Sequence, residues 1–127
     1  MADNTDDLHF RDARHGDVPS IIRLLADDAL GRSREHYGDV QDPAYLKAFE
    51  RIDADPQNRL IVADLDGRVV GCMQLTMIPH MTFRGGTRLQ IEGVRVDPAF
   101  RARQIGGAMM QWAIALGREH DCHLAQL

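Results

Sequence analysis

The residues best suited to chemistry surround the expected start of a helix, where glycine and arginine gather. Gly106 and Gly107 lack a β-carbon, so a phosphate group could approach the backbone closely there. The first turn of a helix offers unpaired amide hydrogens, and the helix dipole favours negative charge at that end. Arg101 and Arg103 add two cationic side chains beside it. The segment therefore predicts a binding site for a small anionic ligand, with phosphate as the favoured group.

The strand in front of this helix changes the parity of its apolar residues. Leu89 and Ile91 are apolar at odd positions, whereas Val94 and Val96 are apolar at even positions. A strict two-residue period cannot change in this way without one extra residue, which predicts a β-bulge near residues 92–93. A bulge leaves amides or carbonyls unpaired, and these groups can hydrogen-bond the amides of a ligand. The alternative is an irregular edge strand that binds nothing.

Other chemistries find weaker support. The chain contains neither GxxxxGK[ST] nor GxGxxG followed by an acidic residue about 20 positions later. The spacing of His120, Cys122 and His123 fits no structural-zinc pattern, so we expect no metal. Cys72 and Cys122 form no CxxC pair, and we expect reduced, part-buried thiols rather than a disulfide.

Alternating and helical spacings predict the elements that position this segment. Asp17 and Asp42 are the expected caps of the first two helices, and Asp66-Gly67 is a strong hairpin turn. Residues 31–41, 78–87 and 98–104 are expected to be loops. We expect strands at 8–13, 59–64, 69–75, 88–96 and 124–127, and helices at 18–29, 43–53 and 105–120.

This order of elements predicts a mixed α and β layered domain, of class α+β, that spans residues 1–127. Most neighbouring strands can pair antiparallel. The long helix after Gln104, however, must return the chain to a parallel neighbour. Its apolar stripe, which includes Trp112, is expected to lie in the core.

Composition excludes several classes of protein. The chain has 127 residues, of which 44% are hydrophobic and 27% are charged, as in soluble globular domains. No apolar run approaches the roughly 20 residues that span a bilayer, and the acidic start lacks the features of a signal peptide. We therefore expect a cytoplasmic protein without a membrane partner. The net charge of −4 argues against nucleic-acid binding.

The sequence VRVDPAFRARQIGGA, residues 94–108, resembles the acetyl-coenzyme A signature of the GNAT acetyltransferase superfamily. That signature is an apolar strand that ends in Val-x-Pro, an aromatic residue, and Arg/Gln-x-x-Gly-x-Gly/Ala at the start of a helix. The order of elements from Leu8 to Leu127 also resembles the GNAT fold. The resemblance implies a mostly antiparallel central sheet with a splayed parallel strand pair, flanked by helices.

The resemblance also implies roles for individual residues. Backbone groups of Val94 and Val96 would hydrogen-bond the pantetheine arm of acetyl-coenzyme A. The pyrophosphate would be wrapped by the amides of Arg101, Ala102, Arg103, Gln104, Ile105, Gly106, Gly107 and Ala108. Family members transfer acetyl directly to an amine, and Glu92 stands where many relatives place an acidic base. A structural or substrate-orienting carboxylate is the alternative for Glu92.

His80 lies in the expected loop where relatives often contact the acceptor. It could bind the substrate or act as a second base, because imidazole titrates near neutrality. The alternative is a surface loop histidine. The acidic residues Asp27, Asp28, Glu35 and Asp39 border a loop that often covers the acceptor. They would suit a cationic amine, although a solvated face is favoured.

Two features depart from the signature. Gln104 replaces its first glycine, which is tolerable if the backbone there stays helical but could crowd the pyrophosphate. The chain also ends as the fifth strand starts, before the helix and two strands that the family usually adds. The usual tyrosine acid is missing as well, because both tyrosines, Tyr37 and Tyr45, precede Gly93. We expect either a shortened sequence, which we favour, or a second chain, as in a homodimer, over the exposed sheet edge.

Three functions remain open at this point. The leading hypothesis is an N-acetyltransferase that uses acetyl-coenzyme A and a small primary amine. The first alternative is a non-catalytic acyl-coenzyme A sensor or scaffold of the same fold. The second is an unrelated phosphate- or nucleotide-binding module.

Overall fold

The computed structural model describes residues 7–27 and 42–127, and a five-stranded sheet forms its centre. Strands β1 to β4 pair antiparallel in chain order, and β5 pairs parallel with β4. The predicted α+β class and the parallel last strand are therefore confirmed. The strands are β1 (Leu8–Asp12), β2 (Asn58–Leu65), β3 (Arg68–Pro79), β4 (Thr87–Val96) and β5 (Leu124–Gln126).

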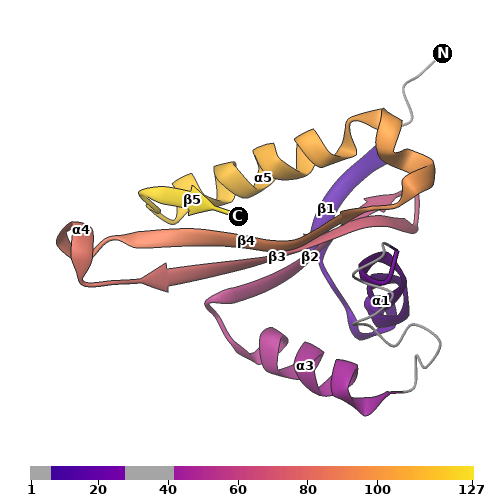
Figure 1. Ribbon diagram of the computed structural model, residues 1–127, viewed down its shortest axis with the longest axis horizontal. Coiled ribbons are helices and arrows are strands. Elements are labelled where there is room, and N and C mark those ends of the chain that lie inside the picture. The colour runs from indigo at the N-terminus through magenta and orange to yellow at the C-terminus, as the bar shows by residue number, and fades with distance from the viewer. Residues whose placement is uncertain (1–6, 28–41) are drawn as a thin grey trace.

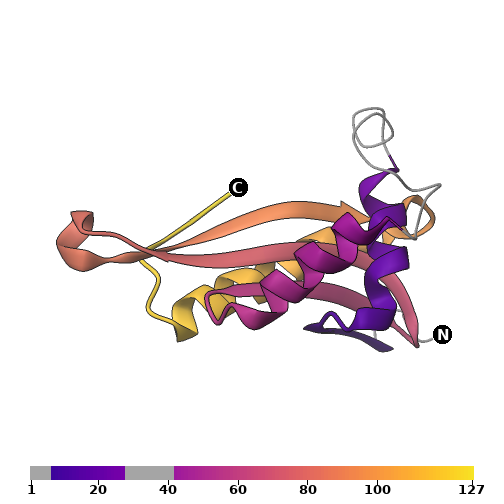
Figure 2. The same cartoon turned by 90° about the horizontal axis from the view of Figure 1, so that it is seen from below.

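Helices cover both faces of the sheet. Helix α5 (Ile105–Glu119) lies along one face, and α1 (Val18–Leu25) and α3 (Pro43–Ala54) lie on the other (Figures 1 and 2). Three short pieces complete the described chain: the 3₁₀ turns η2 (His15–Asp17) and η3 (Pro98–Arg103), and α4 (Thr82–Gly85). The expected helical position Ala29 and the loop at 31–41 lie outside the described residues.

Helix α5 packs through the apolar stripe that its sequence predicts. Ile105, Met109 and Ala113 are fully buried against the sheet, where Leu75 and Leu89 are also inaccessible. The core position of Trp112 is confirmed in part, because its ring is half-buried with its centroid 6.0 Å from that of Phe10. Periodic burial of this kind is the main source of helix stability in a folded chain.

The opposite face is built from α1 and α3. Helix α1 buries Val18, Ile21, Ile22 and Leu24, whereas α3 buries Phe49. Helix α3 begins as expected, because the Asp42 carboxylate accepts the amide hydrogen of Ala44 at 2.9 Å. The two helices lie side by side over β2 and β3 (Figure 2).

The predicted capping role of Asp17 is wrong. Its carboxylate makes no capping bond to α1 and instead accepts hydrogen bonds from Arg11, at 2.8 and 3.1 Å, and from the Arg14 amide, at 2.7 Å. Arg11 also donates to Asp64 on β2 at 3.0 Å. Burial alone would raise the pKa of Asp17, but the bonds from Arg11 and Arg14 outweigh it and hold the pKa below its usual range. Ion pairs of Arg11 with Asp17 and Asp64 therefore hold the start of α1 against the sheet.

The two hairpins differ in how well the sequence predicts them. The Asp66-Gly67 turn is confirmed, with φ of +52° and +86°, as a tight hairpin turn requires. The connection expected at 78–87 is found there but is shorter, because β3 continues to Pro79 and β4 starts at Thr87, with the short α4 between them. Proline ends strand β3 rather than excluding it, since an end position needs no donor. The β3–β4 hairpin thus extends well beyond the helices (Figure 1).

Candidate functional site

Strand β4 carries the predicted bulge. Cys72 of β3 pairs with Arg95 and Gln74 pairs with Glu92, so β4 has one more residue than β3 in this interval. Gly93 lies within it at φ of +64°, a backbone conformation that favours glycine. The apolar parity changes as the sequence requires. Ile91 before the bulge, and the half-buried Val94 and Val96 after it, all pack in the α5-side core.

Two side chains hold the bulge from the α1 side. The buried Cys72 thiol lies with its Sγ 3.6 Å from the Gly93 carbonyl oxygen, to which it donates. Burial raises the pKa of Cys72 to about 12, so the thiol keeps the proton that this bond needs. Leu25 of α1 approaches from the same side, since a β-carbon at Gly93 would lie 4.0 Å from its Cδ2.

Beyond the bulge, one edge of β4 faces away from its partner β3. The Asp97 amide donates to the Val70 carbonyl on β3 at 2.8 Å. Since alternate residues of a strand point their backbone groups to opposite edges, those of Val94 and Val96 face the β5 side. Strand β5 pairs only with residues 88–90 of β4 among the described residues. This edge can therefore accept a ligand that carries its own amides.

Arginine side chains already contact the carbonyls of this edge. Arg95 Nη1 lies 2.9 Å from the Val94 oxygen, and Arg101 Nε lies 3.3 Å from the Val96 oxygen. Each carbonyl oxygen has two lone pairs, so a second donor can still bind. Together with these carbonyls, the backbone amides of Val94 and Val96 are the groups that this edge offers to a ligand.

The turn after β4 corrects one further expectation. Residues 98–103 form η3 rather than a loop, because the Asp97 carboxylate caps the Ala99 amide at 3.0 Å and Pro98 suits the first helical position. Gln104 then adopts a left-handed conformation, with φ of 60° and ψ of 24°. The condition that the backbone at Gln104 stays helical is therefore not met. A left-handed residue favours glycine, which explains why the signature has glycine at this position.

The first turn of α5 leaves amide hydrogens unused. The Ala108 amide donates to the Gln104 carbonyl at 3.2 Å, whereas the amides of Gly106 and Gly107 donate to no other described residue. A β-carbon at Gly107 would meet no atom within 4 Å, and one at Gly106 would lie 3.9 Å from Val96 Cγ2. Space and donors for an anion therefore occur together at this turn.

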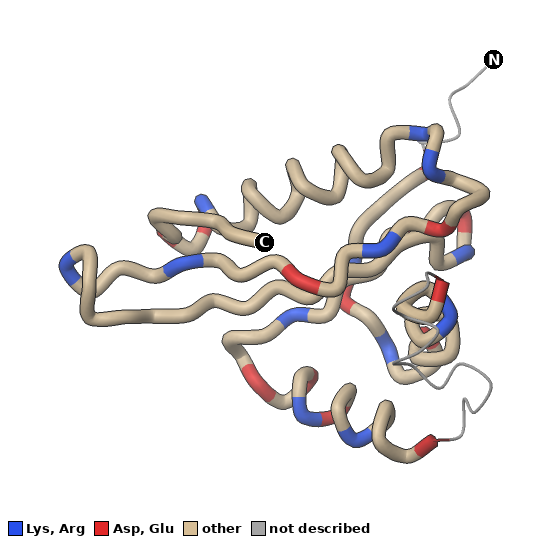
Figure 3. The backbone as a smooth tube through the Cα atoms, in the orientation of Figure 1, with Lys and Arg blue, Asp and Glu red and all other residues tan. Residues whose placement is uncertain are grey.

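Basic residues lie at this turn, at the end of the sheet opposite the β3–β4 hairpin tip (Figure 3). Arg101 is 58% exposed, and its Nη2 lies 3.6 Å from the carboxylate of Asp27 at the end of α1. Arg103 and Arg68 lie on the Phe100 ring, with Cζ atoms 4.9 and 5.1 Å from its centroid. The other acidic residues expected near the acceptor, at 28, 35 and 39, lie outside the described residues.

The structure separates Glu92 from His80. Glu92 is exposed immediately before the bulge, across from Gln74. His80 lies at the hairpin tip, where its Nε2 is 2.9 Å from the Nε2 of His123. Six residues of extended strand from Gln74 to His80 correspond to roughly 20 Å. The geometry therefore gives no support to His80 as a second base beside Glu92.

The sequence does not predict one part of the site, a cavity next to the sheet. A cavity of about 200 Å³ lies between α1 and α3 and reaches the sheet at Gln74, the cross-strand partner of Glu92. Its walls come from separate elements, so no local pattern predicts it. The lining residues are Val18, Ile21, Ile22, Leu25, Tyr45, Ala48, Phe49, Ile52, Leu60 and Gln74.

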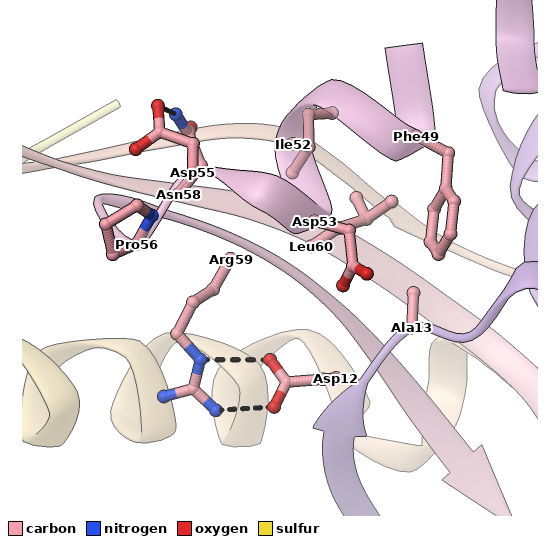
Figure 4. Close-up of a pocket in the computed structure, with 10 residues that line it drawn as sticks. All are labelled: Asp12, Ala13, Phe49, Ile52, Asp53, Asp55, Pro56, Asn58, Arg59 and Leu60. Atoms are coloured by element: carbon pink, nitrogen blue, oxygen red, sulfur yellow. Dashed lines mark hydrogen bonds and ion pairs between the residues drawn. The ribbon is translucent and has the colours of Figure 1, made fainter. Parts of the chain in front are cut away.

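A second cavity, of about 260 Å³, lies at the carboxyl end of α3 (Figure 4). It is lined by acidic residues that include Asp12, Asp53 and Asp55. Arg59 crosses it to bind both oxygens of Asp12, at 3.0 and 3.1 Å. None of its lining residues belongs to the segment from the bulge to α5, so we do not include it in the site.

Three further observations concern the described residues alone. No three metal-ligating side chains among them come together, and His120, Cys122 and His123 therefore form no such group. No helix among them is both long and apolar enough to cross a membrane. Cys72 and Cys122 are both free thiols.

The fold agrees with comparisons to known proteins. The model of the acetyltransferase (GNAT) family matches residues 20–127. A solved transcriptional regulator from Bacillus halodurans C-125 is 42% identical, with a TM-score of 0.91, and the match covers 94% of this chain and 80% of that one. The chain therefore belongs to the GNAT acetyltransferase family.

More distant solved structures share the fold. Glucosamine-6-phosphate N-acetyltransferase from Arabidopsis thaliana is 20% identical, with a TM-score of 0.78 over 94% of this chain and 80% of that one. A predicted acetyltransferase from Clostridium acetobutylicum, solved with acetyl-coenzyme A, is 17% identical, with a TM-score of 0.72 over 94% and 79%.

Proposed function

We propose that this chain is an acetyl-coenzyme A-dependent N-acetyltransferase that acts on the primary amine of a small molecule. One observation carries the proposal: the open edge of β4 at the bulge is followed, after η3, by a helix start where the amides of Gly106 and Gly107 are unused. The first feature suits the amides of pantetheine, and the second suits a pyrophosphate. We expect this reaction in the cytoplasm.

In the proposed complex, the backbone of Val94 and Val96 binds the pantetheine arm. The turn that runs from Arg101 through Ala102, Arg103, Gln104 and Ile105 to Gly106, Gly107 and Ala108 wraps the pyrophosphate. Arg101 is exposed enough to exchange its contact with Asp27 for a phosphate oxygen.

Glu92 is the proposed general base. It takes a proton from the bound ammonium, directly or through water, and the free amine attacks the acetyl carbon. The new carbon–nitrogen bond forms as the carbon–sulfur bond breaks, and the departing sulfur takes up a proton. A backbone amide at the bulge is the proposed donor to the carbonyl oxygen as negative charge develops there.

Isothermal titration with acetyl-coenzyme A and with coenzyme A tests cofactor binding. We expect Arg101→Glu to weaken both affinities about tenfold or more, because it reverses the charge beside the phosphates. We expect Glu92→Gln to leave both affinities unchanged and to lower kcat about 100-fold or more. Absence of binding to the wild-type chain would remove the proposal.

A non-catalytic acyl-coenzyme A sensor or scaffold is the second candidate. Gln104 in the left-handed position favours it, because a side chain there lies next to the proposed pyrophosphate site. The solved relative described as a transcriptional regulator adds to this reading. This candidate predicts cofactor binding without amine-dependent release of thiol.

A further inference from the structure

We propose that the acceptor is a primary amine on a small apolar body, such as one aromatic ring, which is seated in the cavity between α1 and α3. The inference rests on the proposed N-acetyltransferase function and names its substrate class. Figure 2 shows α1 and α3 side by side on the face of the sheet that carries this cavity.

The walls of the cavity are apolar. Helix α1 contributes aliphatic side chains, and Phe49 and Ile52 of α3 lie opposite them. The polar side chains in the lining are Tyr45 and Gln74, and the Gln74 amide already donates to Asn58 at 3.1 Å. An acceptor rich in hydroxyl groups would lose hydrogen bonds to water and find few replacements here. An apolar acceptor has no such hydrogen bonds to lose when it enters the cavity.

The size of the cavity limits the acceptor. Its volume of about 200 Å³ exceeds the roughly 150 Å³ of an engineered apolar cavity that binds benzene. One ring with a short alkyl chain therefore fits, whereas an oligosaccharide does not.

The position of the cavity aims the amine at the reacting groups. Gln74 in its lining pairs with Glu92, and cross-strand partners carry side chains on the same face about 5 Å apart. Leu25, also in the lining, reaches the bulge at Gly93. An amine on a chain of one or two carbons at the mouth of the cavity would thus lie beside both Glu92 and the bulge.

The acidic cavity at the end of α3 is the competing place for an amine. It would suit a polycation, but its lining includes neither Gln74 nor any residue of β4. Of its acidic residues, Asp12 is already paired, because Arg59 binds both of its carboxylate oxygens. The apolar cavity is therefore the better acceptor site.

The test measures thiol release from acetyl-coenzyme A with four amines: 2-phenylethylamine, ethylamine, glucosamine and spermidine. We expect kcat/KM for 2-phenylethylamine to exceed that for ethylamine about 10- to 100-fold, as burial of one ring implies. Glucosamine and spermidine should be no better than ethylamine. A preference for glucosamine or spermidine would overturn the inference and leave the N-acetyltransferase function standing.

A pair of variants tests the location. Ala48 and Ala54 are both exposed residues of α3. Ala48→Phe adds a ring at the cavity lining, and Ala54→Phe is the control outside both cavities. We expect Ala48→Phe to raise KM for 2-phenylethylamine about tenfold, more than it raises KM for ethylamine, and to leave the Kd for acetyl-coenzyme A unchanged. Ala54→Phe should change none of these. Equal effects of the two variants, or of Ala48→Phe on both amines, would contradict the proposed seat.

A binding measurement separates the two proposals. Titration of 2-phenylethylamine into the chain saturated with coenzyme A should show binding that Ala48→Phe weakens about tenfold. If coenzyme A itself does not bind, the proposed function fails and this inference fails with it. If coenzyme A binds and 2-phenylethylamine does not, this inference alone is overturned.

Discussion

The two faces of the sheet are packed in different ways. On the α5 face, Leu75, Leu89 and Met109 are completely buried in one continuous apolar cluster. On the face covered by α1 and α3, Leu25 and Leu60 are only half-buried and line a cavity. The sheet thus has a closed face, where the core under α5 is fully packed, and an open face, where a cavity remains between α1 and α3. The closed face holds the fold together, and the open face leaves space next to Glu92.

The helices on the two faces are also attached differently. Helix α5 is held by apolar packing, whereas the start of α1 is tied to β1 and β2 through Arg11, Asp17 and Asp64. Apolar packing depends little on pH, and ion pairs depend on it strongly. The comparison therefore predicts which conditions loosen the open face first.

The sharpest test deletes similar side chains on the two faces. Leu75→Ala removes a fully buried side chain of the closed core and should lower the free energy of unfolding by about 3 kcal/mol. Ile52→Ala removes a half-buried side chain beside the cavity and should cost about 1 kcal/mol. Urea unfolding measures both. Equal losses would mean that the two faces are packed alike.

Arg11→Met tests the attachment by charge. It should lower the free energy of unfolding by about 2 kcal/mol at pH 7, since it removes the guanidinium that both Asp17 and Asp64 bind. Both pKa values lie below the ordinary 3.8 in the folded chain, so the pairs stabilise it above about pH 4 and lose this effect as pH falls through the folded values. Unfolding curves of wild type and variant should converge below pH 4. A constant difference down to pH 2 would contradict the assignment to these carboxylates.

Gly107→Ala separates stability from cofactor binding. The added methyl group meets no protein atom within 4 Å, and alanine is a better helix former, so stability should rise by up to about 1 kcal/mol. The same methyl group would lie where a phosphate approaches, and the affinity for coenzyme A should fall about 5- to 10-fold. Thermal unfolding and titration measure the two effects. Unchanged affinity would place the pyrophosphate elsewhere.

Gln104→Gly should have the smallest effect. Glycine relieves the left-handed backbone but adds freedom to the unfolded chain, so stability should rise by less than about 1 kcal/mol. Affinity for coenzyme A should stay the same or improve, since no contact to the ligand is removed. A loss of affinity would show that the Gln104 side chain itself binds the cofactor.

The sequence predicts the parts of the molecule that depend on local spacing. The parity change between Ile91 and Val94 predicts the bulge, because side-chain alternation permits no other simple solution. The stripe from Ile105 to Leu116 predicts the buried side of α5, and Asp66-Gly67 predicts the first hairpin. Each of these signals lies within a few residues of the structure that it specifies.

The features that the sequence does not predict depend on distant partners. Asp17 has the residue type of a helix cap, but Arg11 and Arg14 take its carboxylate. The left-handed backbone at Gln104 follows from the junction of two helical turns, not from the residue type. Gln74 enters the candidate site only through its pairing with Glu92, and the cavity needs four elements brought together, α1, α3, β2 and β3. The spacing of neighbouring residues in the sequence cannot predict contacts between residues that are far apart in it.

The thiol that supports the bulge has a practical consequence for the experiments above. Enzymatic release of coenzyme A is followed with reagents that react with thiolates, and the protein's own cysteines set the background. Burial raises the pKa of Cys72, so its thiol stays protonated at the pH of the assay, and its side chain is shielded from reagent. Cys122 is partly exposed, and burial also raises its pKa. A disulfide reagent should therefore report the released cofactor against a slow and small signal from the folded chain.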